Sequence, residues 1–427
     1  MKEIIIILIS LLLLVIMISK KTKLINGITD KYFYSLSTFG YLFTRILLTI
    51  IIFLVFNRQG PGDLTEVFYK QALLAKYGKL IYNDFNSSYS VLLPYLLSLP
   101  LYISNHPVSI VFFFILFDLL VLFVSTRYII PTFNINKKDF LWFFIFCPIN
   151  FLFTIYYVQD EIIIAFFMVL AFALIIRQKQ FWAIIILVLG FYFTKFISIY
   201  FFIPLLLIFD KKYFFAFFVG IIIPSAFLYL FNVDLLMPLK EGEYTAIGPN
   251  LWTLLDNLGI DANPKVSYSI LLIITSILII FQIRTLKFDN KIKFRFENIL
   301  KYILLYSLIF MSFSRKSFSF YFLITIVFFL ILIIIYHKSI PVESNRQKIR
   351  YYCDLYGMYI YLFLISILYV FSDFLRKQNS FNFLSLFSFL VILLTFVLQI
   401  KLIYQIVLDL LAHSKNEDDS FLQVISQ

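Results

Sequence analysis

Ionisable side chains that could act on a substrate stand beside long apolar runs. They come from segments far apart in the chain: Asp63, Asp160, Glu161, Lys195, Arg315 and Lys316. A carboxylate can accept the proton of an attacking hydroxyl group. Cations can hold a phosphate and stabilise the negative charge that develops as a bond to it breaks. The combination favours group transfer from a phosphorylated donor, with acids and bases in separate roles.

Each of these residues also has a plainer interpretation. Asp63 follows a Gly-Pro-Gly turn at 60–62, where Asp suits the N-cap of a helix. Asp160 and Glu161 could begin a helix, because acids there complement the helix dipole. Lys195 could extend its ammonium group to the membrane surface. For Asp118, inside the apolar run "FFFILFDLLVLF", we expect a structural hydrogen bond.

The composition is that of a membrane protein. Of the 427 residues, 62% are hydrophobic and 14% are charged, whereas soluble domains carry roughly 25% charged residues. Apolar runs recur at lengths near the roughly 20 residues that cross a bilayer as helix. We therefore expect an all-α, polytopic transmembrane helical bundle with about 11–13 spans. The abundance of Ile, Phe, Lys and Asn suggests an AT-rich bacterial genome. We therefore expect the chain in a bacterial plasma membrane.

The net charge of +12 does not indicate nucleic-acid binding, because Lys and Arg gather on the cytoplasmic side of membrane proteins. Three scattered His residues make no metal-binding spacing, and two Cys residues make no disulfide framework. We interpret Cys147, inside an apolar run, as a packing residue.

The distribution of Lys and Arg gives an orientation and a domain plan. Lys20, Lys21 and Lys23 place the linker after the first apolar run inside the cell. The segments that follow from this orientation are an N-terminal anchor and linker at 1–35, a transmembrane module at 36–231 with its first outer loop at 57–88, an outer loop at 232–265, C-terminal spans at 266–412 and an inner tail at 413–427.

Two segments fit this orientation only if they do not cross as straight helices. Segment 89–103 is short and contains Pro94 and Pro100, so we expect a broken juxtamembrane helix at the outer face. Block 181–209 has Lys195 at its centre, where burial costs about 2.5–3.5 kcal/mol. We expect two short helices with Lys195 at the outer turn between them. Before these, "DLTEVFYKQALLAKYGKL" has the spacing of an amphipathic interfacial helix.

A lipid-linked sugar phosphate would use such a site. Polyprenyl phosphate is a good leaving group, so the reaction needs one general base and positive charge at the phosphate. We assign Asp63 as the general base. The expected substrate-binding residues are Lys195, Arg315, Lys316, Asp160, Glu161, Tyr89 and Arg58.

The chain resembles the GT-C class of polytopic glycosyltransferases over about residues 36–335. Within that class it is similar to the first mannosyltransferase of glycosylphosphatidylinositol synthesis and its bacterial relatives. The resemblance is carried by two features of the first outer loop, Asp63 and, further along, Val67-Phe68. It is also carried by the stretches "YSVLLPYLLSLP", "CPINFLFTIYYVQDEIIIAFF", "GFYFTKFISIYFFIP" and "FSRKSFSFYFLI". It implies a polyprenyl-phosphate donor, with mannose favoured, an inverting transfer, juxtamembrane helices in the first outer loop and a site on the non-cytoplasmic side.

The chain departs from that family at three places. Eukaryotic members carry Asp-x-Asp in the first outer loop, but here Asp63 stands alone, which leaves the use of Mg²⁺ or Mn²⁺ open. The family's Gly-Asn-Ala before the second Asp is replaced by residues 157–159. Loop 232–265 shows no match, so we expect a different acceptor, either a lipid-linked or a cell-surface glycan.

Two other classes of membrane protein remain open. A polysaccharide polymerase or ligase would use one large outer loop with Arg or His, whereas here the candidate acids precede the largest late loop, 232–265. A flippase or transporter of lipid-linked glycans would need charged groups within several spans, where only Asp118 and Lys195 qualify.

Overall fold

The computed structural model describes residues 2–19, 30–55, 63–230, 233, 246–260, 263–287, 292–338, 345–377 and 383–425. Within these ranges every regular element is a helix, and strand-type pairing is limited to two isolated bridges. The predicted all-α class is therefore confirmed. The chain forms two compact units.

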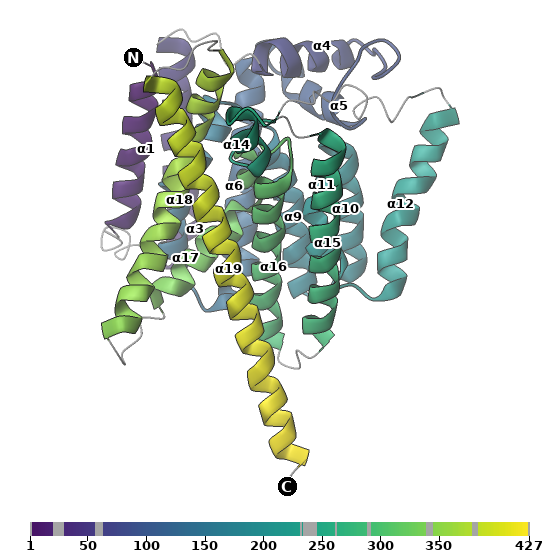
Figure 1. Ribbon diagram of the computed structural model, residues 1–427. Coiled ribbons are helices and arrows are strands. Elements are labelled where there is room, and N and C mark those ends of the chain that lie inside the picture. The colour runs from purple at the N-terminus through teal and green to yellow at the C-terminus, as the bar shows by residue number, and fades with distance from the viewer. Residues whose placement is uncertain are drawn as a thin grey trace. The chain divides into compact units, whose positions relative to one another are not determined.

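The N-terminal unit comprises residues 8–202 and 209–243. Its α-helices are α1 (Lys2–Ile18, whose first residues belong to the other unit), α3 (Asp30–Thr49), α4 (Lys70–Lys76), α5 (Leu93–Ser98), α6 (Val108–Val124), α7 (Lys137–Ile145), α8 (Pro148–Phe151), α9 (Glu161–Ile176), α10 (Gln180–Phe193), the start of α11 (Ser198–Leu206) and α12 (Lys211–Leu230). Short 3₁₀ or π segments extend several of them, at Ile50–Val55, Asp63–Tyr69, Leu99–Tyr102, Ser125–Ile129, Ile130–Phe133 and Leu152–Tyr156. Helices α9 and α10 lie side by side (Figure 1).

The C-terminal unit comprises residues 1–7, 203–208 and 244–427. Its helices are α14 (Leu251–Asn257), α15 (Pro264–Lys287), α16 (Ile292–Phe313), a 3₁₀ segment (Ser319–Thr325), α17 (Ile326–Lys338), α18 (Asn345–Lys377) and α19 (Phe383–Ile425). Helices α18 and α19 pack against each other (Figure 1). The segment expected as a polar outer loop, 232–265, contains the short helix α14, which Asn250 caps by accepting a hydrogen bond from the Thr253 amide.

Seven helices among the described residues are long and apolar enough to span a membrane. A bent pair, Lys137–Ile145 with Pro148–Tyr156, would make an eighth, and five further apolar helices have only 10–17 residues. These lengths and compositions make the chain a multi-pass membrane protein. The predicted 11–13 spans would require shorter helices to cross as well.

The chain bends by 50° between α7 and the helical segment that starts with α8. Pro148 has no amide hydrogen, so helical bonding cannot continue through it. Side chains take over the carbonyl groups left at the end of α7. Asn150 Nδ2 donates to Phe144 O over 3.4 Å, and Arg45 Nη2 donates to Ile145 O over 3.1 Å.

Arg45 belongs to a buried polar cluster between α3 and α6. Its guanidinium carbon lies 5.2 Å from the centroid of the Tyr41 ring. The Tyr41 hydroxyl donates a hydrogen bond to Asp118, which confirms the structural bond expected for Asp118. All three side chains are buried. The cluster therefore ties α3, α6 and the bend at Pro148 together.

Two segments that were expected at the outer face have the predicted helical form. Segment 89–103 contains α5 followed by a 3₁₀ turn, with Pro94 and Pro100 each in the first positions of its own helix. The predicted interfacial helix runs from Asp63 to Lys76 as a π turn followed by α4. In Figure 1, α4 lies along the top of the view and packs against α5.

The apolar block 181–209 is interrupted where Lys195 was expected to break it. Helix α10 ends at Phe193 and α11 begins at Ser198. Gly190 allows close packing beside this break, because a Cβ atom there would lie 2.9 Å from Phe167 Cβ and 3.0 Å from Phe202 Cζ. The predicted pair of short helices is confirmed.

Candidate functional site

Asp63 begins the interfacial helix and is held from a different part of the chain. Gln159 Nε2 donates to Asp63 Oδ2 over 3.1 Å and also to Tyr157 O over 3.1 Å. Between these residues, Val158 has a φ of 54°, a left-handed conformation that is strained for a β-branched side chain. The half-buried Asp63 carboxylate is thus fixed by a short, strained loop before α9.

Lys195 points into the start of α9, where it meets two fully buried carboxyl groups. Its Nζ donates to Glu161 Oε1 over 2.5 Å and lies 2.7 Å from Asp160 Oδ1. The Lys195 side chain itself is 14% exposed. Burial of this kind is compatible with charge only when the charges are paired.

Segment 90–92 and the break after α10 are joined through their backbones. The Ser90 amide donates to Thr194 O, and the Leu92 amide donates to Tyr192 O, each over 3.0 Å. This places the ring of Tyr89 5.1 Å from Lys195 Nζ, within range of a cation–π interaction. The Tyr89 ring also lies 5.5 Å from the Phe68 ring of the interfacial helix. Four segments therefore meet around Lys195.

The electrostatics show that these groups share one environment. Burial raises the pKa of Tyr89 well above its usual value; the charge of Lys195 opposes this, and those of Asp160, Asp63 and Glu161 add to it. Burial also raises the pKa of Asp160, with Lys195 opposing and Asp63 contributing. We call Asp63, Tyr89, Asp160, Glu161 and Lys195 the carboxylate cluster.

The cluster has three carboxyl groups and one ammonium group. Lys195 Nζ already contacts the carboxyl groups of Asp160 and Glu161, and its expected contact with a phosphate stays a prediction. Asp160 Oδ2 and Glu161 Oε2 accept no hydrogen bond from any described residue. The arrangement is suited to holding hydroxyl groups and accepting a proton, and it supplies little net positive charge. No three His, Cys, Asp or Glu side chains in the described ranges are grouped as metal ligands.

Arg315 and Lys316 lie in the C-terminal unit, in the turn between α16 and the following 3₁₀ segment. This turn is bound to segment 246–250 by two backbone hydrogen bonds, Ile247 N to Arg315 O and Ser317 N to Ile247 O, each of 3.0 Å. Arg315 is nearly buried and pairs with Asp256 of α14 over 3.4 Å. That Arg315 and Lys316 lie close to the carboxylate cluster stays a prediction. Arg58, also expected to bind substrate, lies outside the described residues.

Three functional candidates escaped the sequence reasoning. Gln159 positions Asp63, Asp256 pairs with Arg315, and Asn250 Nδ2 donates to Ser317 Oγ over 2.8 Å and to Ile247 O over 2.9 Å. The stretch "NLWTLLDN", with an N-cap residue before an amphipathic run, was a recognisable signal for α14. No comparable signal pointed to Gln159.

Comparison with known proteins gives no match to a family model, to a curated protein or to a solved structure.

Proposed function

We propose that this chain is an integral-membrane glycosyltransferase of GT-C type. It moves a hexose, with mannose favoured, from a polyprenyl-phosphate donor to a lipid-linked or cell-surface glycan on the non-cytoplasmic side. The observation that carries the proposal is the fixed Asp63 carboxylate beside the Lys195 ion pairs, between juxtamembrane helices and the start of α9.

In the proposed reaction Asp63 is the general base. The carboxylate takes the proton of the acceptor hydroxyl while that oxygen forms a bond to the anomeric carbon of the sugar. The bond from the anomeric carbon to the phosphate oxygen breaks, and its electron pair leaves with polyprenyl phosphate. Asp63 suits this role because it is only half buried, and its bond from Gln159 leaves acceptor capacity for a hydroxyl.

The other cluster members have supporting roles in this proposal. Asp160 and Glu161 hold Lys195, and Lys195 with Tyr89 shapes the wall against which the sugar lies. Because Lys195 Nζ already contacts two carboxyl groups, charge on the leaving phosphate needs a further cation. We assign that role to Arg315 and Lys316, and a divalent ion is the alternative.

The experiment uses membranes that contain the chain and radiolabelled polyprenyl-phosphate mannose or glucose. Sugar transfer to a lipid or glycan fraction, absent from control membranes and reduced in Lys195→Ala, is the expected result. A glycan flippase would move labelled lipid across the bilayer without sugar transfer, which would overturn the proposal. The buried Asp118 favours that second function, because it places an ionisable group within a candidate span.

A further inference from the structure

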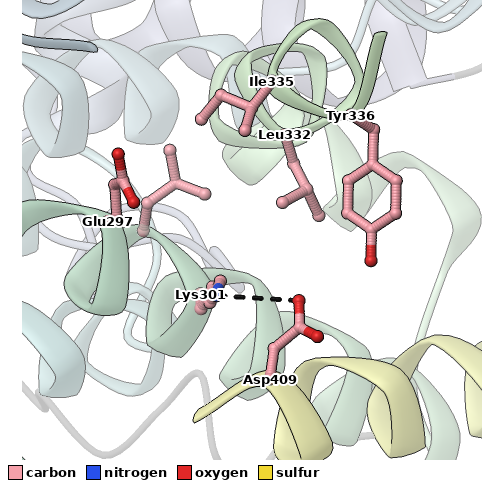
Figure 2. A pocket seen from close by; sticks show the side chains of 7 residues that line it. Glu297, Lys301, Leu332, Ile335, Tyr336 and Asp409 are labelled. Atoms are coloured by element: carbon pink, nitrogen blue, oxygen red, sulfur yellow. Dashed lines mark ion pairs between the residues drawn. The ribbon is translucent and has the colours of Figure 1, made fainter. Parts of the chain in front are cut away.

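A cavity in the C-terminal unit carries charges of both signs. It has a volume of about 320 Å³ and lies among α16, α17 and α19. Its polar lining comes from Glu297 and Lys301 of α16, Tyr336 of α17 and Asp409 of α19 (Figure 2). Leu300, Leu332 and Ile335 supply the apolar lining. A volume near the lower end of the range for small-molecule sites suits a head group or a similar small moiety.

The charges are arranged with the cation deep and one anion at the mouth. Lys301 has a side chain that is 11% exposed, while that of Asp409 is 42% exposed. Their charged atoms are 3.6 Å apart, which makes an ion pair and is too long for a hydrogen bond. Figure 2 shows the Tyr336 ring and the Asp409 carboxylate facing the same space. The lining therefore offers one donor cation, two carboxylates and an aromatic ring.

The cavity lies at the end of the spans that the sequence places at the cytoplasmic surface. It is formed by the first turns of α16 and the last turns of α17. The flanking segments 284–301 and 338–350 are rich in Lys and Arg, which marks a cytoplasmic boundary. The cavity belongs to the C-terminal unit and the carboxylate cluster to the N-terminal unit, so the cavity is a separate feature. It depends on neither the proposed transferase reaction nor its donor.

We propose that this cavity binds the zwitterionic head group of a phospholipid with a primary ammonium, of the phosphatidylethanolamine class. Lys301 pairs with the phosphate, and Asp409 and Glu297 accept hydrogen bonds from the ammonium, which also lies against the Tyr336 ring. The aliphatic side chains contact the first part of the lipid. The cavity has two carboxyl groups, of Asp409 and Glu297, and only one ammonium, of Lys301, so it disfavours a head group with net negative charge. A head group with a quaternary ammonium is also disfavoured, because that ammonium cannot donate hydrogen bonds to the carboxyl groups.

The test is native mass spectrometry of the detergent-purified, delipidated protein. It is titrated with phosphatidylethanolamine, phosphatidylcholine or phosphatidylglycerol of identical acyl chains. We expect phosphatidylethanolamine to bind most tightly, and Asp409→Asn and Lys301→Gln each to weaken it about tenfold. Asp354→Asn is the matched control, because Asp354 pairs with Lys401 over 3.2 Å on α18 and α19 but does not line the cavity.

Three outcomes overturn the proposal. The first is equal binding of the three lipids. The second is an equal effect of Asp409→Asn and Asp354→Asn. The third is competition by soluble glycerophosphoethanolamine at the same concentration as the lipid, which would mean that the cavity takes a free solute. Glu297→Gln, at a partly exposed position, repeats the test if Lys301→Gln fails to fold.

Discussion

Gln159 donates a hydrogen bond to Asp63 across 96 positions of the chain, with an Nε2–Oδ2 distance of 3.1 Å. The bond joins the loop before α9 to the start of the interfacial helix. Because Gln159 also donates to the Tyr157 carbonyl, its amide is fixed at both hydrogens. Asp63 is therefore oriented by a side chain that makes no proton transfer itself.

Gln159→Leu is expected to lower sugar transfer about tenfold, because a hydrogen bond to a charged group is lost. Gln159→Glu should lower the rate of sugar transfer further, because it places a second carboxyl group beside Asp63. The measurement is the rate of transfer in membranes with matched protein levels. Gln178→Leu, on the exposed turn after α9, is the control and should keep the parental rate. A Gln159→Leu rate equal to the parent would show that Asp63 does not need this bond.

Lys195→Met is expected to lower the thermal stability of the purified protein strongly. Removing one partner of a buried ion pair leaves uncompensated charge and costs about 3–5 kcal/mol. The matched control is Lys70→Met, because Lys70 and Glu66 form an exposed pair worth about 1 kcal/mol or less. The double variant Lys195→Met with Glu161→Gln should recover part of the loss. Equal melting temperatures of Lys195→Met and Lys70→Met would contradict the buried ion pairs.

Stability should fall as pH rises through the raised pKa of Asp160. The folded protein keeps a proton on this carboxyl at pH values where the unfolded chain, with a pKa of about 3.9, has lost it. The folded state then binds more protons, so the contribution is present at low pH and is lost toward high pH. Melting temperatures from about pH 4 to about pH 8 test this. Asp160→Asn should flatten the profile, and an identical profile in the variant would refute the assignment.

Gly248→Ala should disrupt the turn that carries Arg315. Gly248 has a φ of 113°, and a Cβ atom there would lie 1.9 Å from Ser317 O. Gly259→Ala is the matched control, since its φ of 80° is also positive but nothing lies within 4 Å of the added atom. Strain alone costs about 1–2 kcal/mol, so Gly248→Ala should melt well below Gly259→Ala. Similar melting of the two would mean that segment 246–250 is not clamped to the turn.

The sequence predicted those features that follow from the free-energy cost of burying a charge in the membrane and from the effect of proline on helices. An ammonium group at the middle of a span is expensive, so the break at Lys195 could be foreseen. Pro94 and Pro100 gave the broken helix after the first outer loop. The helix beginning at Asp63 followed from its apolar spacing.

Other features depend on contacts between distant segments and gave no local signal. The bend at Pro148 lies in an unbroken apolar run, and the Arg45 side chain that satisfies the freed carbonyl is 100 positions away. The contact of Lys195 with Glu161, 34 positions away in the chain, likewise gave no local signal. Pairing of this kind is decided by packing between segments.

The most direct measurement is sugar transfer by purified protein given radiolabelled polyprenyl-phosphate mannose and a lipid extract as acceptor. Asp63→Asn is compared with Glu66→Gln, an exposed carboxylate on the same helical segment that pairs with Lys70. The account predicts loss of transfer by a factor of about 10²–10⁴ in Asp63→Asn, as for removal of a general base, and a parental rate in Glu66→Gln. Parental transfer by Asp63→Asn would contradict the account.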